Sequence, residues 1–174
     1  MRAVLDACVL FPPVMRQTLL AAAQLGHFAR VWSPRFLEDW VRAAARADPH
    51  AERAIRRHLA ELDAAFPAAS VAPEPLPEDS LPDPDDVHVL GACLAAKAGF
   101  LITRNHRDFP TGTLSRHGVS RSDPDPFLTA LVQEDAQLAQ AAAEIAQAVD
   151  ASASPRAILK RAGLPRLGKR VAAL

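Results

Sequence analysis

Apolar and polar residues follow one another along the chain in blocks that indicate helices and strands in turn. The central stretch, residues 81–110, reads LPDPDDVHVLGACLAAKAGFLITRNHRDFP. A polar, proline-rich start leads into a helix-length apolar run, with Asp86 where the helix would begin and Gly99 where it would end. The following run, 100–103, is typical of a strand that is covered on both faces of a parallel sheet.

The first half of the chain predicts strand, helix, strand, helix and helix, at residues 2–10, 14–25, 28–32, 34–46 and 51–66. Asp6 interrupts the apolar first strand. A buried acid is costly unless it is paired, hydrogen-bonded or bound to a cation. The alternative is a capping or turn aspartate, because Pro12 and Pro13 follow closely.

The second half begins with a stiff, proline-rich connection at 67–85, which contains a candidate short strand at 70–72. After the central unit we expect an edge strand near Gly118, one long helix at 127–149 and two short helices at 155–162 and 165–173. The order of elements predicts an α/β domain over residues 1–125, with a mainly parallel sheet and helices on both faces. Residues 126–174 then form a helical extension.

Composition supports a folded protein of the cytoplasm. Of the 174 residues, 49% are hydrophobic, which is enough for a core without disulfides or structural metal ions. Cys8 and Cys93 lie in apolar runs and resemble buried thiols more than a disulfide or a zinc pair. No apolar run approaches the ~20 residues of a membrane span, and no signal peptide is evident, since Asp6 interrupts the short apolar start.

Positive and negative charges balance overall, with 20 Lys and Arg against 20 Asp and Glu, so net charge does not indicate a nucleic-acid binder. The distribution is uneven, because six Lys or Arg residues and no acid follow Asp150. Arg53, Arg56 and Arg57 also share a segment with His58. The plain interpretation of either cluster is a solvated helix face.

Several oxygen-bearing side chains are expected at one edge of the sheet. Asn105 and Asp108 come just after the strand at 100–103, and Asp86 begins the preceding helix. Ligand sites of open α/β sheets collect at the carboxyl ends of the strands, so Asp6 joins this group if the two strands are neighbours. Bare carboxylates cannot crowd together because like charges oppose ionisation, and a divalent cation resolves the conflict.

The donor set favours Mg²⁺ or Mn²⁺, which prefer oxygen ligands and commonly bridge to phosphates, and no Cys/His set has zinc spacing. Such a cation suits phosphodiester hydrolysis, because it polarises the phosphate and lowers the pKa of an attacking water. Plainer roles remain open for some of these residues. Asp83 and Asp85 can serve the proline turn and helix cap, Asp108 can cap a turn, and His88 is better interpreted as packed than as a base.

The ordered motifs VLDACVLFP, FLEDWVR, LPDPDDVHVLGACLAA and LITRNHRDFP resemble those of the PIN-domain ribonucleases, in particular the VapC-type toxins of toxin–antitoxin pairs. The resemblance covers about residues 1–125 and implies a PIN-like, Rossmann-like fold. It also implies a Mg²⁺-dependent endoribonuclease that cleaves RNA by metal-activated water. Implied partners are an RNA substrate, a VapB-like antitoxin and a second copy of the chain in a homodimer.

Carried over residue by residue, the resemblance implies that Asp6 and Asp86 are the first and third metal ligands. The second acid is Asp39, with its neighbour Glu38 as an alternative. The fourth acidic position is held by Asn105, whose amide oxygen can ligate the cation or hold a water, and Asp108 can supply the missing charge. Thr103 is placed to orient a ligand through its hydroxyl. Three basic residues flank this site and are candidates to meet the RNA backbone, namely Arg104, His106 and Arg107.

Other functions fit the residues less well. A haloacid-dehalogenase phosphatase needs an acid two positions after Asp6, where Cys8 stands, and no Gly-rich phosphate loop or receiver-type acid pair is present. Asn105 keeps open a catalytically inactive PIN-like module that binds RNA or protein. A nuclease of the same architecture that acts on DNA is the third hypothesis.

Overall fold

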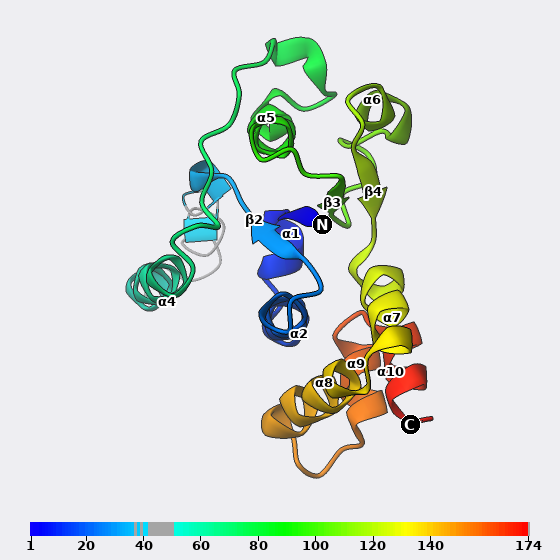
Figure 1. Cartoon of the computed structure of the whole chain (residues 1–174). Coiled ribbons are helices and arrows are strands. Elements are labelled where there is room, and N and C mark those ends of the chain that lie inside the picture. Colours follow the sequence, from blue (N-terminus) through cyan, green and yellow to red (C-terminus); the bar gives the residue numbers. More distant parts are fainter. Residues whose placement is uncertain (37, 39, 42–50, 174) are drawn as a thin grey trace.

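Four parallel strands form the central sheet, in the order β2-β1-β3-β4 (Figure 1). The computed structural model describes residues 1–36, 38, 40, 41 and 51–173. The strands are β1 (Arg2–Leu5), β2 (Ala29–Val31), β3 (Phe100–Ile102) and β4 (Ser120–Ser122). In register, Val4 pairs with Val31 on one side and with Leu101 on the other. The parallel sheet is confirmed, and β1 and β3 are the neighbours that a shared site at their carboxyl ends requires.

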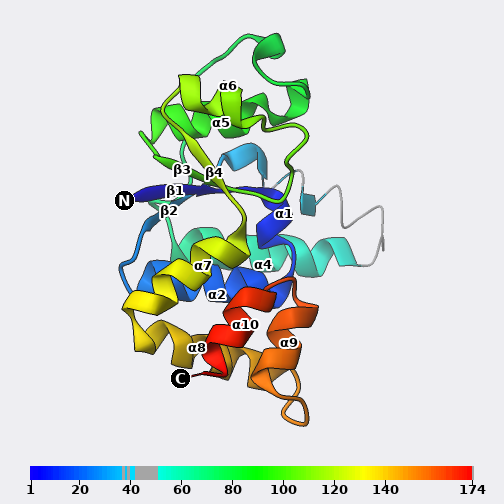
Figure 2. The same ribbon diagram turned by 90° about the vertical axis from the view of Figure 1, so that its right-hand side faces the viewer.

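Helices cover both faces of this sheet, as Figure 2 shows: α5 and α6 lie on one side, and α2, α4 and the C-terminal helices on the other. Alternation along β1 explains the two layers, because Val4 joins the hydrophobic cluster under α5 while Ala3 and Leu5 join the cluster under α2. The helices are α1 (Ala7–Leu10), α2 (Pro13–Gln24), α4 (Ala51–Ala65), α5 (Val87–Ala95), α6 (Thr111–Arg116), α7 (Pro124–Glu134), α8 (Ala136–Val149), α9 (Pro155–Arg161) and α10 (Pro165–Val171), with 3₁₀ turns η1 (Glu78–Ser80) and η2 (Pro84–Asp86).

The C-terminal helices share a core with the sheet. Leu128 of α7, Leu138 of α8, Leu159 of α9 and Leu167 of α10 are fully buried in the same cluster as Leu19 of α2. The extension is therefore packed on the α2 face, and the domain boundary at residue 125 stays a prediction. Within the described residues, no helix combines the length and apolar character that a membrane crossing needs.

The first predicted strand is too long. β1 ends at Leu5, and the apolar run that follows folds as α1, whose amides at Val9 and Leu10 donate to Asp6 O. A short apolar run fits a buried strand and a helical turn equally well, which is why the pattern misled. The predicted strand at 70–72 is reduced to a bridge between Trp32 and Ser70.

Three boundaries farther along also differ. The predicted long helix is broken at Asp135, which is extended and caps α8 by accepting a hydrogen bond from Gln137 N at 2.7 Å. Residues 111–116 form α6, so the edge strand begins at Ser120 rather than near Gly118. α5 ends at Ala95, before the predicted end at Gly99. The chain leaves the helix through Lys97, whose φ of 50° is the left-handed conformation that was expected of Gly99.

Candidate metal centre

Asp6 stands directly after β1, and the sheet holds its backbone in place. Its N–H donates to Ile102 O at 3.1 Å, which continues the ladder between β1 and β3. Although Asp6 is the N-cap residue of α1, its side chain makes no capping hydrogen bond. The residue is only 6% exposed, and its Oδ2 accepts from Thr103 Oγ1 at 2.6 Å and from Cys8 Sγ at 3.1 Å. The buried carboxylate is thus satisfied by side chains, as burial requires.

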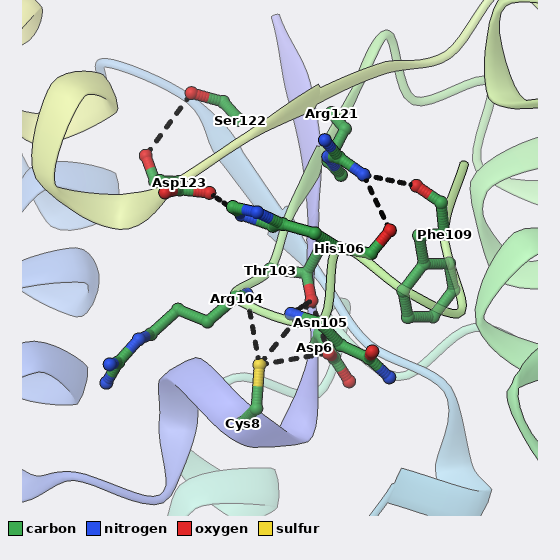
Figure 3. A network of polar contacts seen from close by, with 10 residues as sticks. All are labelled: Asp6, Cys8, Thr103, Arg104, Asn105, His106, Phe109, Arg121, Ser122 and Asp123. Atoms are coloured by element: carbon green, nitrogen blue, oxygen red, sulfur yellow. Dashed lines mark hydrogen bonds and ion pairs between the residues drawn. The ribbon is translucent and has the colours of Figure 1, made fainter. Parts of the chain in front are cut away.

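Thr103 connects Asp6 to the loop after β3 (Figure 3). It is fully buried, and its N–H donates to Ser122 O at 3.1 Å in the ladder with β4. Its hydroxyl donates to Asp6 and accepts from Asn105 N at 2.9 Å. Because the backbone of Thr103 is fixed by the sheet, its hydroxyl holds both the first carboxylate and the start of the loop at 103–108.

Asn105 links the remaining predicted acids. Its Nδ2 donates to Asp86 Oδ2 at 3.0 Å, and its Oδ1 accepts from Asp108 N at 3.3 Å. Asp86 ends η2 and is the N-cap residue of α5, again without a side-chain capping bond. The amide nitrogen of Asn105 therefore positions Asp86, and its amide oxygen positions Asp108.

Three carboxylates come close together at this point. One oxygen each of Asp83, Asp86 and Asp108 lies within 4.8 Å of the other two. The turn η2 brings Asp83 and Asp86 together, because Asp86 N donates to Asp83 O at 3.1 Å and residues three apart eclipse in a 3₁₀ turn. Asp83 serves the turn as the sequence predicted, because its Oδ1 accepts a hydrogen bond from Asp85 N at 2.9 Å. That Asp83 also joins the carboxylate group was not predicted, although the spacing of three residues around Pro84 was the available signal.

Asp6 and Asp86 meet at a cavity of about 170 Å³ between the end of β1 and the start of α5. Ser33 and His88 also line it, and His88 Nδ1 lies 2.8 Å from Ser33 Oγ. At the rim, Asp85 forms an ion pair with Arg35. Asp86 therefore belongs both to the cavity that Asp6 lines and to the group of three carboxylates.

The sequence offers two candidates for the second acid, Asp39 and Glu38. Asp39 lies outside the described residues. Glu38 is described, and it lines a separate cavity together with Leu59 and Asp63 of α4. Glu38 is not among the residues that line the cavity of Asp6 and Asp86.

The three predicted phosphate-binding cations point in different directions. Arg107 is exposed, with 93% of its side chain accessible, and its Nε lies 3.9 Å from Asp108 Oδ1. His106 pairs with Asp123, and Figure 3 shows its ring directed toward that residue. The Arg104 side chain extends away from Asn105 in the same view.

Burial and charge keep the thiol next to Asp6 protonated. Desolvation, followed by the negative charge of Asp6, raises the pKa of Cys8 to about 12. The same two causes raise the pKa of Cys93 to about 12. Both cysteines are free, and Cys93 is buried as predicted, whereas Cys8 is only half-buried and acts as a hydrogen-bond donor to Asp6.

The donor set fits a hard divalent cation. Carboxylates held within 4.8 Å of one another repel, and a divalent cation bound among them would relieve that repulsion. All the converging atoms are oxygens, which suits Mg²⁺ or Mn²⁺ better than zinc.

Comparison with known proteins gives one family. The model of the family described as PIN domain matches residues 2–107. No curated protein and no solved structure matches the chain. The matched segment includes Asp6, Asp86 and Asn105, and it ends one residue before Asp108.

Proposed function

The chain belongs to the PIN-domain family, and from that premise we propose that it is an endoribonuclease that hydrolyses RNA phosphodiester bonds with a bound divalent cation. PIN domains are generally nucleases that bind divalent metals through acidic residues. The observation that carries the proposal is the group of Asp83, Asp86 and Asp108, whose oxygens lie within 4.8 Å of one another beside the cavity lined by Asp6.

We assign Asp86 as the central ligand because it belongs to both the carboxylate group and the cavity. Asp83 and Asp108 would hold the same cation, and Asp6 would bind it or a water beside it. Asn105 orients Asp86 through its amide, and Thr103 orients Asp6 through its hydroxyl. Asp39 remains a proposed further ligand. When bound, the cation would polarise the phosphate and make an attacking water more acidic.

We further propose Mg²⁺ as the resident ion, with Mn²⁺ as a substitute, and the role of toxin in a type II toxin–antitoxin system. The support is the ordered set of four motifs that resemble VapC-type toxins. That role would bring a VapB-like antitoxin that blocks the cleft, a homodimer and a cytoplasmic location.

Cleavage by purified protein tests the proposal. Labelled single-stranded RNA is incubated with Mg²⁺, with Mn²⁺ or with EDTA, and endonucleolytic products are resolved on a gel. We expect cleavage with either metal and none with EDTA. Asp86→Asn and Asp108→Asn should each lower the rate by at least about 100-fold, since a misplaced reactant costs that much. Asp79→Asn, in η1 and outside the carboxylate group, is the matched control and should cleave normally.

Two outcomes of that assay favour the alternatives. Asn105, an amide at the expected fourth acidic position, supports a module that binds RNA or protein without cleaving it. RNA binding with no cleavage under any metal would establish that function. Faster cleavage of single-stranded DNA than of RNA of the same sequence would instead identify a DNA-acting nuclease.

A further inference from the structure

The helices α9 and α10 carry an exposed positive surface that the proposed metal centre does not use. Six cations and no acid follow Asp150. We call them the basic C-terminal surface: Arg156, Lys160, Arg161, Arg166, Lys169 and Arg170. All are exposed except the half-buried Arg170. Arg161 lies 3.4 Å from Asp150 Oδ2, and the other five form no ion pair with any residue that the structure describes.

Helix stabilisation does not account for all of this charge. Lysines and arginines in the last turns of α9 and α10 complement the negative end of the helix dipole. Arg156 and Arg166 instead follow Pro155 and Pro165 in the first turns, at the positive end. A cation is disfavoured there, so these two arginines cost stability rather than adding to it.

The surface is held rigidly against the rest of the fold. Asp125 of α7 is 8% exposed, and its carboxylate accepts from Arg166 N at 3.0 Å and Leu167 N at 2.9 Å. α10 also packs closely on α9, because a Cβ at Gly168 would lie 3.0 Å from Arg156 O. A ligand that binds these cations therefore meets helices that are already ordered, which lowers the entropic cost of binding.

Arg104 joins this surface to the loop of the metal centre. It follows Thr103 directly, and its side chain leads away from Asn105 (Figure 3). A Cβ at Gly163, in the turn between α9 and α10, would lie 3.5 Å from Arg104 Nη1. Positive charge thus runs from the loop after β3 to the C-terminal helices, which lie below α1 in Figure 2.

We propose that the basic C-terminal surface, with Arg104, binds the phosphate backbone of the RNA on one side of the cleavage position. The inference rests on the proposed function for the choice of RNA as substrate. Unpaired cations supply affinity for phosphates without any apolar contact. A protein interface needs a buried apolar centre, and the exposed large hydrophobic residues, Met1, Phe11, Leu25 and Val149, lie outside α9 and α10.

Binding of a fluorescein-labelled single-stranded RNA in EDTA, followed by anisotropy over a range of salt concentrations, tests this surface. The test variant is Arg156→Gln/Arg166→Gln/Lys169→Gln, and the matched control is Arg53→Gln/Arg57→Gln/Arg116→Gln. Because the test variant removes three cations that would neutralise phosphates, the slope of log affinity against log salt should fall by about 2, and affinity at 0.1 M salt by about 100-fold. The control should stay within about twofold of wild type, because a uniform charge effect would move both equally.

Thermal unfolding of the same variants separates binding from folding. The test variant should have an unchanged or higher Tm, because two of its three substitutions remove cations from helix N-termini. If the test variant does not fold, the double variant Arg156→Gln/Arg166→Gln is measured in its place. Its slope of log affinity against log salt should be smaller than that of wild type by about 1.4.

The proposal is overturned if the test variant binds RNA like wild type with the same salt slope. It is overturned too if RNA binding is unchanged while the variant loses affinity for polyglutamate, since the surface would then serve an acidic protein. Cleavage of the same RNA by wild type with Mn²⁺ is measured separately. Absent cleavage with surface-dependent binding rejects the nuclease and leaves the RNA-binding surface in place.

Discussion

The amide of Asn105 donates to Asp86 Oδ2 over 3.0 Å, where the family resemblance places a fourth acid. The contact joins the loop after β3 to the start of α5. It gives one carboxylate of the proposed metal centre a fixed direction without adding charge. A neutral donor in this place lowers the repulsion among the acids when no cation is bound.

Asn105→Asp should make the protein more dependent on metal. The substitution removes the hydrogen bond to Asp86 and adds a like charge, so we expect the metal-free protein to lose about 1–3 kcal/mol. It also adds a ligand, so Mn²⁺ should raise the Tm more than in wild type; a tenfold gain in affinity corresponds to about 1.4 kcal/mol.

Differential scanning fluorimetry with and without Mn²⁺ checks this expectation, with Asn105→Ala as the control that removes the donor and adds no charge. Equal Mn²⁺ responses in the aspartate and alanine variants would contradict it.

Thr103→Val should destabilise the fold by leaving Asp6 without its shortest hydrogen bond. Both residues are buried, and loss of a bond to a charged group costs about 1.5–3 kcal/mol. Thr103→Ser keeps the hydroxyl and should cost no more than about 1.5 kcal/mol for the lost methyl. Urea unfolding measures both, and equal losses would show that packing rather than the hydroxyl matters at this position.

Gly91→Ala should damage the packing of α5 on the proline-rich connection. A Cβ there would lie 2.4 Å from Glu74 O, a backbone atom, and 2.9 Å from Pro73 Cβ. Glu74 N also donates to Gly91 O, so the connection cannot withdraw without losing that bond. We expect a loss of about 1–3 kcal/mol in the free energy of unfolding.

Gly112→Ala in α6 is the control, because nothing lies within 4 Å of its Cβ position. It should be neutral or stabilise by up to about 1 kcal/mol. A Gly91→Ala variant as stable as this control would show that α5 packs differently.

The two thiols should make stability fall in alkaline solution. Burial, and then the charge of Asp6, raises the folded pKa of both from 9.0 to about 12. A raised folded pKa means that the stabilisation is complete below pH 9 and is lost as the pH rises from there toward 12.

Thiolate absorbance during an alkaline titration follows this directly, because the chain contains no tyrosine to obscure it. In the folded protein the thiolates should appear well above pH 9, whereas in urea they should appear near their ordinary pKa. Thiolate formation at the same pH in both states would mean that Cys8 is not shielded beside Asp6.

The sheet and most of the helices could be predicted from the sequence alone, because long periodic segments such as α2 and the apolar run of β3 are compatible with few other structures. The residues at which the elements begin and end could not be predicted. Asp135 breaks the C-terminal helix because its side chain caps α8 and lies 3.0 Å from His27 Nε2, a contact between residues far apart in the chain. α1 was hidden in an apolar run too short to show a period.

The candidate site was predicted in part. Asp6, Asp86, Asn105 and Asp108 gather at the carboxyl ends of neighbouring strands, as parallel pairing requires. The part played by Asp83 depends on the eclipsed geometry of η2, which composition does not disclose. The use of both ends of the Asn105 amide likewise depends on the exact path of the loop at 103–108.

The most direct measurement is the affinity for Mn²⁺, determined by isothermal titration calorimetry on metal-free protein. Wild type should bind, and Asp86→Asn and Asp108→Asn should each bind at least about tenfold more weakly, a loss of about 1.4 kcal/mol. Asp79→Asn should bind as wild type does. Undiminished binding in Asp86→Asn and Asp108→Asn, or no binding by wild type, would contradict a metal centre built on these carboxylates.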